Sequence, residues 1–103
     1  MIKVSIMYPN NEGTTFDLNY YCNTHLPLVG KLLGDALKAI SIDSGIAGGS
    51  PGQAAPFIAM GHLTFESVDA FQNVFGPNAK KILADLPNFT NTQPTVQISE
   101  IKA

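Results

Sequence analysis

The sequence predicts a single α+β domain with the element order β-α-β-β-α-β. Three observations carry this prediction: alternating apolar residues near both ends of the chain, two separate stretches with helical spacing, and a long β-like run over residues 56–66. At 103 residues the chain has room for one domain, which we place at residues 1–103. The order matches the split βαβ, or ferredoxin-like, pattern: a four-stranded antiparallel sheet with both helices on one face.

The first strand is expected over residues 2–8, because its apolar residues alternate with polar ones. Ile2, Val4, Ile6 and Tyr8 share one face. The strand stops at a Pro-Asn-Asn-Glu-Gly stretch that is rich in turn-forming residues.

The first helix is expected over residues 16–25, with a threonine at position 14 or 15 as its N-cap. Pro27 should bend or interrupt it near Leu26, because proline lacks the backbone N–H and restricts the residue before it. A second short helical piece over residues 28–33 should then end at Gly34.

The middle of the chain predicts two strands, over residues 37–46 and 56–66. The glycine-rich residues 45–53 between them have neither helical nor strand character. Few positions on either face of the later strand are strongly polar, so we expect both of its faces to be covered.

The second helix should begin after Ser67, whose hydroxyl suits an N-cap. Its apolar stripe consists of Val68, Phe71, Val74 and Phe75. Gly76-Pro77 should break this helix, and residues 78–86 should resume as a further helical segment. A loop over residues 87–94 leads into a last strand that contains Val96 and Ile98.

Two features predict a homodimer. Only 14% of the residues are charged, which favours burial of surface against a partner subunit. Two helices can also cover only one face of the sheet, and a second sheet packed face to face would cover the other. We therefore expect two copies of the chain to associate through their sheets.

Composition argues against several classes of protein. A net charge of −2 with no basic stripe argues against a nucleic-acid ligand. No apolar run approaches the ~20 residues of a membrane span, and no signal region opens the sequence, so we expect a cytoplasmic protein. The single cysteine, Cys22, excludes an internal disulfide and is interpreted as a structural thiol.

Familiar catalytic and metal-binding motifs are also missing from the sequence. His25 and His62 lack well-placed carboxylates, so no metal site is predicted. The glycine-rich segment lacks the pattern of a phosphate loop, and no Ser-His-Asp arrangement is apparent.

One segment is more specific than packing requires. Residues 16–28 read Phe-Asp-Leu-Asn-Tyr-Tyr-Cys-Asn-Thr-His-Leu-Pro-Leu, a helix with a tyrosine pair that ends in His-x-Pro-Leu. This segment resembles the signature of the EthD family, which is named for a protein of bacterial ethyl tert-butyl ether breakdown. The segments Phe65-Glu66-Ser67 and Asn88-Phe89-Thr90-Asn91 extend the resemblance along the chain, whereas the long loop after Gly45 departs from it.

The resemblance implies a dimeric α+β barrel in which each protomer has a cleft between sheet and helices. It also implies a small apolar or aromatic oxygenated substrate and, as in many relatives of the superfamily, chemistry without a bound metal or organic cofactor. Fold-level analogy of this kind does not name a reaction.

His25, Tyr21 and Tyr8 are the predicted catalytic residues. Histidine is the side chain that exchanges a proton near neutral pH, so His25 is the expected proton carrier. Capping of the helix end is the alternative role for His25, and the two roles are compatible. Asp17, Tyr21 and His25 follow at i, i+4 and i+8 and could form a relay. The alternative role of Asp17 is a negative charge in the first turn of the helix. Tyr8 should line the pocket mouth.

Substrate binding is predicted for Tyr20, Met60, His62 and Phe89. Tyr20 would expose its hydroxyl to the cleft, and Phe89 lies in the closing loop that the resemblance identifies. For His62, which shares a strand face with Met60, a satisfied interface or core residue is the alternative interpretation.

Two functions from different classes stay open. The first is a cofactor-independent enzyme, of the monooxygenase or isomerase type, that acts in the oxidative breakdown of a small molecule. The second is a non-catalytic carrier or accessory subunit that holds an apolar intermediate for a separate oxygenase. The His-tipped aromatic helix favours the enzyme, and the scarcity of charged pairs favours the carrier.

Overall fold

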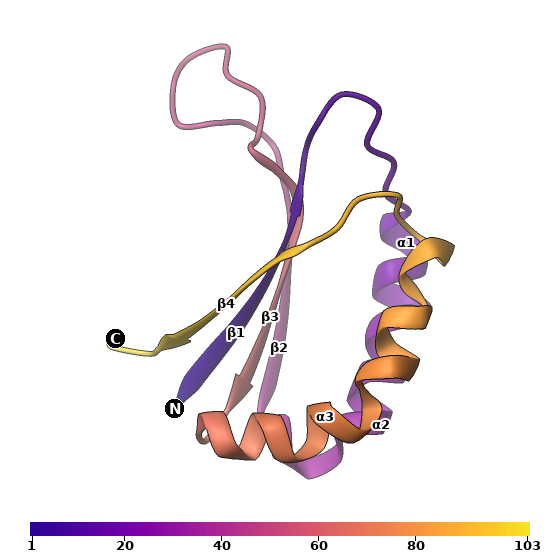
Figure 1. Ribbon diagram of the computed structural model, residues 1–103. Helices are drawn as coiled ribbons and strands as arrows, with labels where there is room; N and C mark the ends of the chain where they lie inside the picture. The colour runs from indigo at the N-terminus through magenta and orange to yellow at the C-terminus, as the bar shows by residue number, and fades with distance from the viewer.

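Four strands form one antiparallel sheet in the computed structural model, which describes residues 1–103. They are β1 (Ile2–Pro9), β2 (Ala39–Ser44), β3 (Phe57–Phe65) and β4 (Thr95–Glu100), in the order β2-β3-β1-β4. Figure 1 shows all the helices on one side of this sheet. The predicted βαββαβ fold with helices on one face is therefore confirmed. The strands at residues 37–46 and 56–66 are slightly shorter than the sequence predicts.

The sheet has one buried face and one open face. Register pairs Val4 with Leu63 and Tyr8 with Ala59, and all four side chains are at most 2% exposed beneath the helices. The opposite face of β3, which includes Met60 and His62, is only half-buried. Within a single chain only one face of this strand is covered, because both long helices lie on the same side of the sheet. Cover of the other face by the sheet of a second chain stays a prediction.

The first helical stretch is one nearly continuous helix from Leu18 to Leu33. It consists of α1 (Leu18–Tyr20), a π-helical turn (Tyr21–His25) and α2 (Leu26–Leu33), followed by a 3₁₀ turn (Gly34–Ala36). The chain stays helical through Pro27, and the change expected near Leu26 is a switch from the π turn to the α-helical α2, which begins at Leu26. Pro27 lies in the first turn of α2, where a missing N–H is tolerated. The wide π turn before it carries both Tyr21 and His25 into the core.

The start of this helix also differs from the prediction. The N-cap is Asp17, whose carboxylate accepts from the Tyr20 backbone N–H at 3.0 Å, and neither threonine takes that role. Phe16 precedes the helix and pairs with Thr90 in an isolated antiparallel bridge. That bridge fastens the start of α1 to the loop before β4.

The second helix, α3 (Val68–Ala84), begins as predicted with the Ser67 hydroxyl accepting from the Ala70 N–H at 3.0 Å. The expected break at Gly76-Pro77 is wrong, since α3 continues through Pro77. Asn78 supports this stretch by donating its side-chain N–H to the Val74 carbonyl (2.8 Å) and to the Leu32 carbonyl of α2 (3.2 Å). In Figure 1, α3 changes direction partway along its length.

Two further elements position the site. A short 3₁₀ turn, Leu86–Asn88, follows the C-cap residue Asp85 and replaces the helical end that the sequence predicts there. The β2–β3 connection projects beyond the sheet in Figure 1. None of the helices combines the length and apolar character that crossing a membrane requires.

Candidate functional site

A cavity of about 380 Å³ lies between the sheet and the helices. Thirteen of its fifteen lining residues are hydrophobic, and they come from β1, β3, β4, the π turn, α2, α3 and the 3₁₀ turn that follows α3. Leu83 and Val96, which are 54% and 55% exposed, line the cavity from α3 and β4 and mark where it opens to solvent. The size and lining are typical of a site for a small apolar molecule.

His25 provides a polar group in this apolar wall. The residue is only 3% exposed, and its Nδ1 lies 2.9 Å from Oδ2 of Asp85. Asp85 comes from the other long helix, where it is the C-cap residue of α3. The contact therefore joins the two helices at the edge of the cavity.

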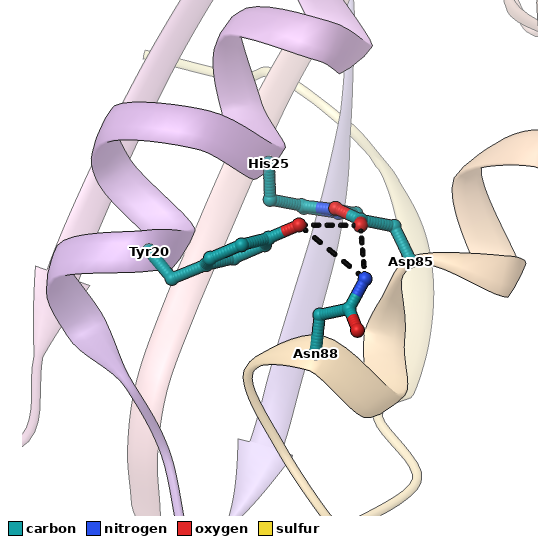
Figure 2. A network of polar contacts seen from close by, with 4 residues as sticks. All are labelled: Tyr20, His25, Asp85 and Asn88. Carbon is teal, nitrogen blue, oxygen red and sulfur yellow. Dashed lines mark hydrogen bonds and ion pairs between the residues drawn. The ribbon is translucent and has the colours of Figure 1, made fainter.

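A network of polar contacts surrounds Asp85, as Figure 2 shows. The Tyr20 hydroxyl donates to Asp85 Oδ1 at 2.7 Å, and the Asn88 side-chain N–H donates to the same oxygen at 2.9 Å. Burial alone would raise the pKa of Asp85, but hydrogen bonds from Tyr20, Asn88 and His25 outweigh it and hold that pKa below its usual value. Asp85 is therefore a carboxylate at neutral pH.

The charge of Asp85 fixes the tautomer of His25. A carboxylate only accepts hydrogen bonds, so Nδ1 of His25 carries the hydrogen and donates it to Asp85. In the neutral imidazole, Nε2 then holds a free lone pair. Nε2 of His25 has no hydrogen-bond partner in the chain. It is not fully buried either, since the Tyr21 hydroxyl is the only fully buried side-chain oxygen or nitrogen without a partner. Nε2 is therefore accessible from the cavity that His25 lines. His25 thus has the geometry of a general base that faces the cavity.

Tyr8 and Tyr21 line the same cavity, from β1 and the π turn. Their ring centroids lie 5.5 Å apart, and the Tyr21 ring stacks on His25 at 5.7 Å. Burial raises the pKa of Tyr8 to about 12 and raises that of Tyr21 further. Each hydroxyl is close enough to shift the other's pKa, yet the Tyr21 hydroxyl has no hydrogen-bond partner. The three predicted catalytic residues therefore share one wall.

Phe89 packs behind this wall and fixes its rings. Its centroid lies 4.6 Å from that of His25, 5.2 Å from Tyr21 and 5.9 Å from Tyr8. Phe89 is buried but does not line the cavity. Tyr20 stacks on Phe89 at 6.1 Å and turns its hydroxyl to Asp85. The structure thus places both residues around His25, outside the cavity wall.

Met60 and His62, by contrast, lie on the open face of the sheet. The helix-facing positions of β3 alternate with them, so the whole thickness of the sheet separates them from His25. The structure does not bring these two residues together with the cavity of the same chain.

His62 takes part in a second polar array that sequence reasoning missed. The Ser5 hydroxyl lies 2.9 Å from His62 Nδ1, and Asp43 Oδ2 lies 3.2 Å from His62 Nε2. The prediction that the chain has no Ser-His-Asp arrangement is therefore wrong, because three adjacent strands bring these residues together. None of them lines a cavity, and neighbouring backbone N–H groups are engaged in sheet hydrogen bonds, so no oxyanion site accompanies the serine.

Asp85 and Asn88 are the other site residues that sequence reasoning missed. A signal for Asp85 exists: it ends a helix, where the helix dipole disfavours negative charge, so a carboxylate there suggests a specific partner. The partner, His25, is sixty residues away along the chain. Of the two roles open to Asp17, a relay with Tyr21 or a charge at the start of the helix, the structure supports the second, since its carboxylate caps α1.

Charge and ligand chemistry narrow what the cavity can hold. No lysine lines it, so the cavity wall has no permanent positive charge to neutralise a carboxylate or phosphate. No group of three or more His, Cys, Asp or Glu residues is arranged to hold a metal ion. A second hollow of about 620 Å³, between residues 15–19 and 87–91, is shallow and polar and is not lined by His25.

Comparison with known proteins matches the chain to one protein family. The EthD domain model matches residues 14–93. A crystal structure of an EthD-like protein from Ralstonia eutropha matches with a TM-score of 0.95 at 37% identity, covering 99% of this chain and 92% of that one. No curated protein matches this sequence.

Two more distant structures share the fold. An EthD family protein from Bacillus halodurans has a TM-score of 0.74 at 24% identity, covering 99% of both chains. A protein from Arabidopsis thaliana has a TM-score of 0.67 at 12% identity, covering 99% of this chain and 95% of that one.

Proposed function

This chain belongs to the EthD domain family, and from that premise we propose that it binds a small, apolar, oxygen-containing organic molecule between its sheet and helices. His25 is the proton carrier in this proposal, and Tyr8 or Tyr21 orients an oxygen of the ligand. The reaction class is cofactor-independent oxidoreductase or isomerase chemistry in the oxidative breakdown of that molecule.

One observation supports this function above the others: an apolar cavity with an accessible imidazole nitrogen backed by a carboxylate. The carboxylate fixes the imidazole's orientation and stabilises the positive charge that forms when Nε2 takes a proton. The apolar wall strengthens this electrostatic effect, because few water molecules compete for either group. A histidine that served only as a helix cap would not need a carboxylate on another helix.

A carrier or accessory subunit for a separate oxygenase is the second candidate. The almost entirely hydrophobic lining favours it, since such a wall holds an apolar molecule without chemistry. The His25–Asp85 pair favours the enzyme. Turnover of a bound compound, measured with and without His25, separates the two.

We also propose that the chain works as a homodimer. The open sheet face, with half-buried side chains such as Met7, Ile58 and Met60, is the surface that a second sheet would cover. Because His62 and Met60 lie on this face, their predicted role in substrate binding would then require the partner subunit.

The test is an NMR titration of protein labelled in its two histidines. A panel of small aromatic hydrocarbons, ethers and ketones is added, and the imidazole signals of His25 and His62 are followed. We expect one compound class to move the His25 signals and leave those of His62 unchanged, because only His25 lines the cavity. Equal movement of both histidines, or none with any class, would refute the proposed site.

The matched variants are His25→Gln and His62→Gln. If the chain is an enzyme, His25→Gln abolishes turnover of the bound compound and keeps the compound's affinity within a few-fold. His62→Gln is the control for loss of an imidazole from a half-buried position outside the cavity. A carrier would show no turnover in any form, with affinity that depends on apolar wall residues such as Val4.

A further inference from the structure

The hydrogen bonds around Asp85 decide which ring nitrogen of His25 stays free of hydrogen (Figure 2). Tyr20 and Asn88 both donate to Oδ1 of Asp85, at 2.7 Å and 2.9 Å. Oδ2 is left for Nδ1 of His25, which lies 2.9 Å away. Because a carboxylate only accepts hydrogen bonds, the hydrogen of the neutral imidazole is held on Nδ1.

Nε2 of His25 is therefore a hydrogen-bond acceptor in the neutral ring, and no group of the chain donates to it. The residue is only 3% exposed, and the cavity that it lines has an almost entirely hydrophobic wall. An acceptor without a donor in such surroundings costs free energy, and a ligand that supplies the donor removes this cost.

The two phenols in the wall do not supply that donor. The Tyr21 hydroxyl is fully buried, lies against Gly61 of β3 and bonds to no group of the chain. The Tyr8 hydroxyl lies near that of Tyr21, and no hydrogen bond joins either of them to His25. The donor for Nε2 has to come from the molecule in the cavity.

Charge narrows the kind of donor that this molecule carries. An ammonium group would bring a charge into an apolar wall, and both oxygens of Asp85 are already engaged by other donors. An ether or a ketone has no hydrogen to offer to a ring nitrogen. A hydroxyl is an uncharged group that provides one.

Resting on the proposed function of the same cavity, we propose that its ligand is an uncharged apolar molecule with a hydroxyl group, such as a phenol, and that this hydroxyl donates to Nε2 of His25. Tyr20 and Asn88 are positioning residues here, because they occupy Oδ1 of Asp85 and leave Oδ2 to the imidazole. The ligand class is thereby narrowed from oxygen-containing molecules to hydrogen-bond donors.

The same wiring provides a variant that reverses the hydrogen bond. In Asp85→Asn the side-chain carbonyl would take the place of Oδ1, since Tyr20 and Asn88 still donate there. The asparagine NH₂ would then face Nδ1 of His25, which would become the acceptor and leave the hydrogen on Nε2. Residue 85 does not line the cavity, so the apolar wall stays the same.

The experiment uses three bicyclic probes that differ at one position. They are 2-naphthol, 2-methoxynaphthalene, in which the hydroxyl hydrogen is replaced by methyl, and naphthalene, which lacks the oxygen. Binding to the full chain is measured by NMR titration at about pH 8, where an ordinary imidazole is neutral, and the ¹⁵N signals of His25 are followed. The variants are Asp85→Asn and His25→Leu, with Gln72→Leu at an exposed position of α3 as control.

We expect the affinity for 2-naphthol relative to 2-methoxynaphthalene to fall by about 3- to 10-fold in Asp85→Asn and in His25→Leu, the worth of one hydrogen bond. The ratio should be unchanged in Gln72→Leu, and naphthalene should bind Asp85→Asn as it binds the parent. In the parent, 2-naphthol should shift the Nε2 signal and 2-methoxynaphthalene should not. A purely structural role of Asp85 would instead weaken all three probes alike.

Two results overturn this inference while leaving the proposed function standing. In the first, the probes bind and the affinity ratio is the same in the parent and in Asp85→Asn. In the second, 2-naphthol binds without moving the Nε2 signal. Both comparisons hold even if His25→Leu does not fold. Failure of all three probes to bind the parent would overturn the cavity as a ligand site, and the proposed function with it.

Discussion

Gly61 on β3 lies against the hydroxyl of Tyr21, and a Cβ at position 61 would overlap that oxygen. The next nearest atom to such a Cβ is Cζ of Tyr21, at 3.5 Å, which is an ordinary contact distance. Gly61 has no unusual backbone conformation, so its lack of a side chain matters here only for space. The absence of a side chain on the middle of the sheet is what admits the phenol.

Gly61→Ala should therefore destabilise the protein by about 1–3 kcal/mol through overpacking. In the Tyr21→Phe background the same substitution should cost much less, because the overlapping oxygen is gone. Chemical denaturation of the four proteins of this double-mutant cycle measures the coupling. Independent, additive effects of the two substitutions would contradict the contact.

Asp85→Asn should destabilise the protein by about 1–3 kcal/mol, because a charge-assisted hydrogen bond to a nearly buried imidazole is lost. It should also change the ¹⁵N signals of His25 away from those of a ring with a fixed Nδ1–H. Asp43→Asn is the matched control, since Asp43 also pairs with a histidine but its side chain is 64% exposed. Its effect should stay below about 1 kcal/mol, and equal effects of the two variants would refute the assigned role of Asp85.

The same carboxylate predicts how stability depends on acid. Its pKa is lower in the folded chain than in the unfolded chain, so its stabilisation is complete above the usual carboxyl value and is lost as pH falls through the lowered one. The free energy of unfolding, measured by denaturation across that acidic range, should fall more steeply with decreasing pH for the parent protein than for Asp85→Asn. Parallel pH dependences of the unfolding free energy in the two proteins would show that Asp85 does not contribute to the acid sensitivity.

Tyr8 predicts the behaviour at the alkaline end. Burial raises its folded pKa to about 12 from the usual value of 10.0, so stability is complete below pH 10 and is lost as pH rises toward 12. Two pKa units correspond to roughly 2–3 kcal/mol for this residue. Tyrosinate absorbance should appear together with loss of circular dichroism, and Tyr8→Phe should reduce the loss of stability. Formation of tyrosinate from Tyr8 at the usual pKa in a folded protein would contradict this.

Association of two chains is tested at the open sheet face. Met60→Glu places a charge in the middle of β3 on that face and should shift the protein toward monomer in sedimentation velocity runs. Gln72→Glu adds the same charge on an exposed position of α3 and should leave the oligomeric state unchanged. A parent protein that sediments as a monomer at all concentrations would contradict the homodimer.

Local signals predicted the elements better than their ends. Ser67 caps α3 as its hydroxyl predicts, and the alternation of β1 gives the correct buried face. Neither Pro27 nor Pro77 ends its helix, because the backbone around each adapts: a π turn precedes Pro27, and the Asn78 side chain donates to the Val74 and Leu32 carbonyls next to Pro77. Local rules for proline do not include such compensation.

Within the site, the sequence by itself determined the residues of one short segment and the fold that carries them. The Tyr-Tyr and His-x-Pro pattern identified His25 and Tyr21 through its resemblance to the EthD family and through the proton chemistry of histidine. Only the tertiary structure decided that Asp85 meets His25, that Gly61 admits the Tyr21 hydroxyl, and that His62 lies on the opposite face of the sheet from His25. These relationships join residues tens of positions apart, and their geometry exists only once the helices have packed on the sheet.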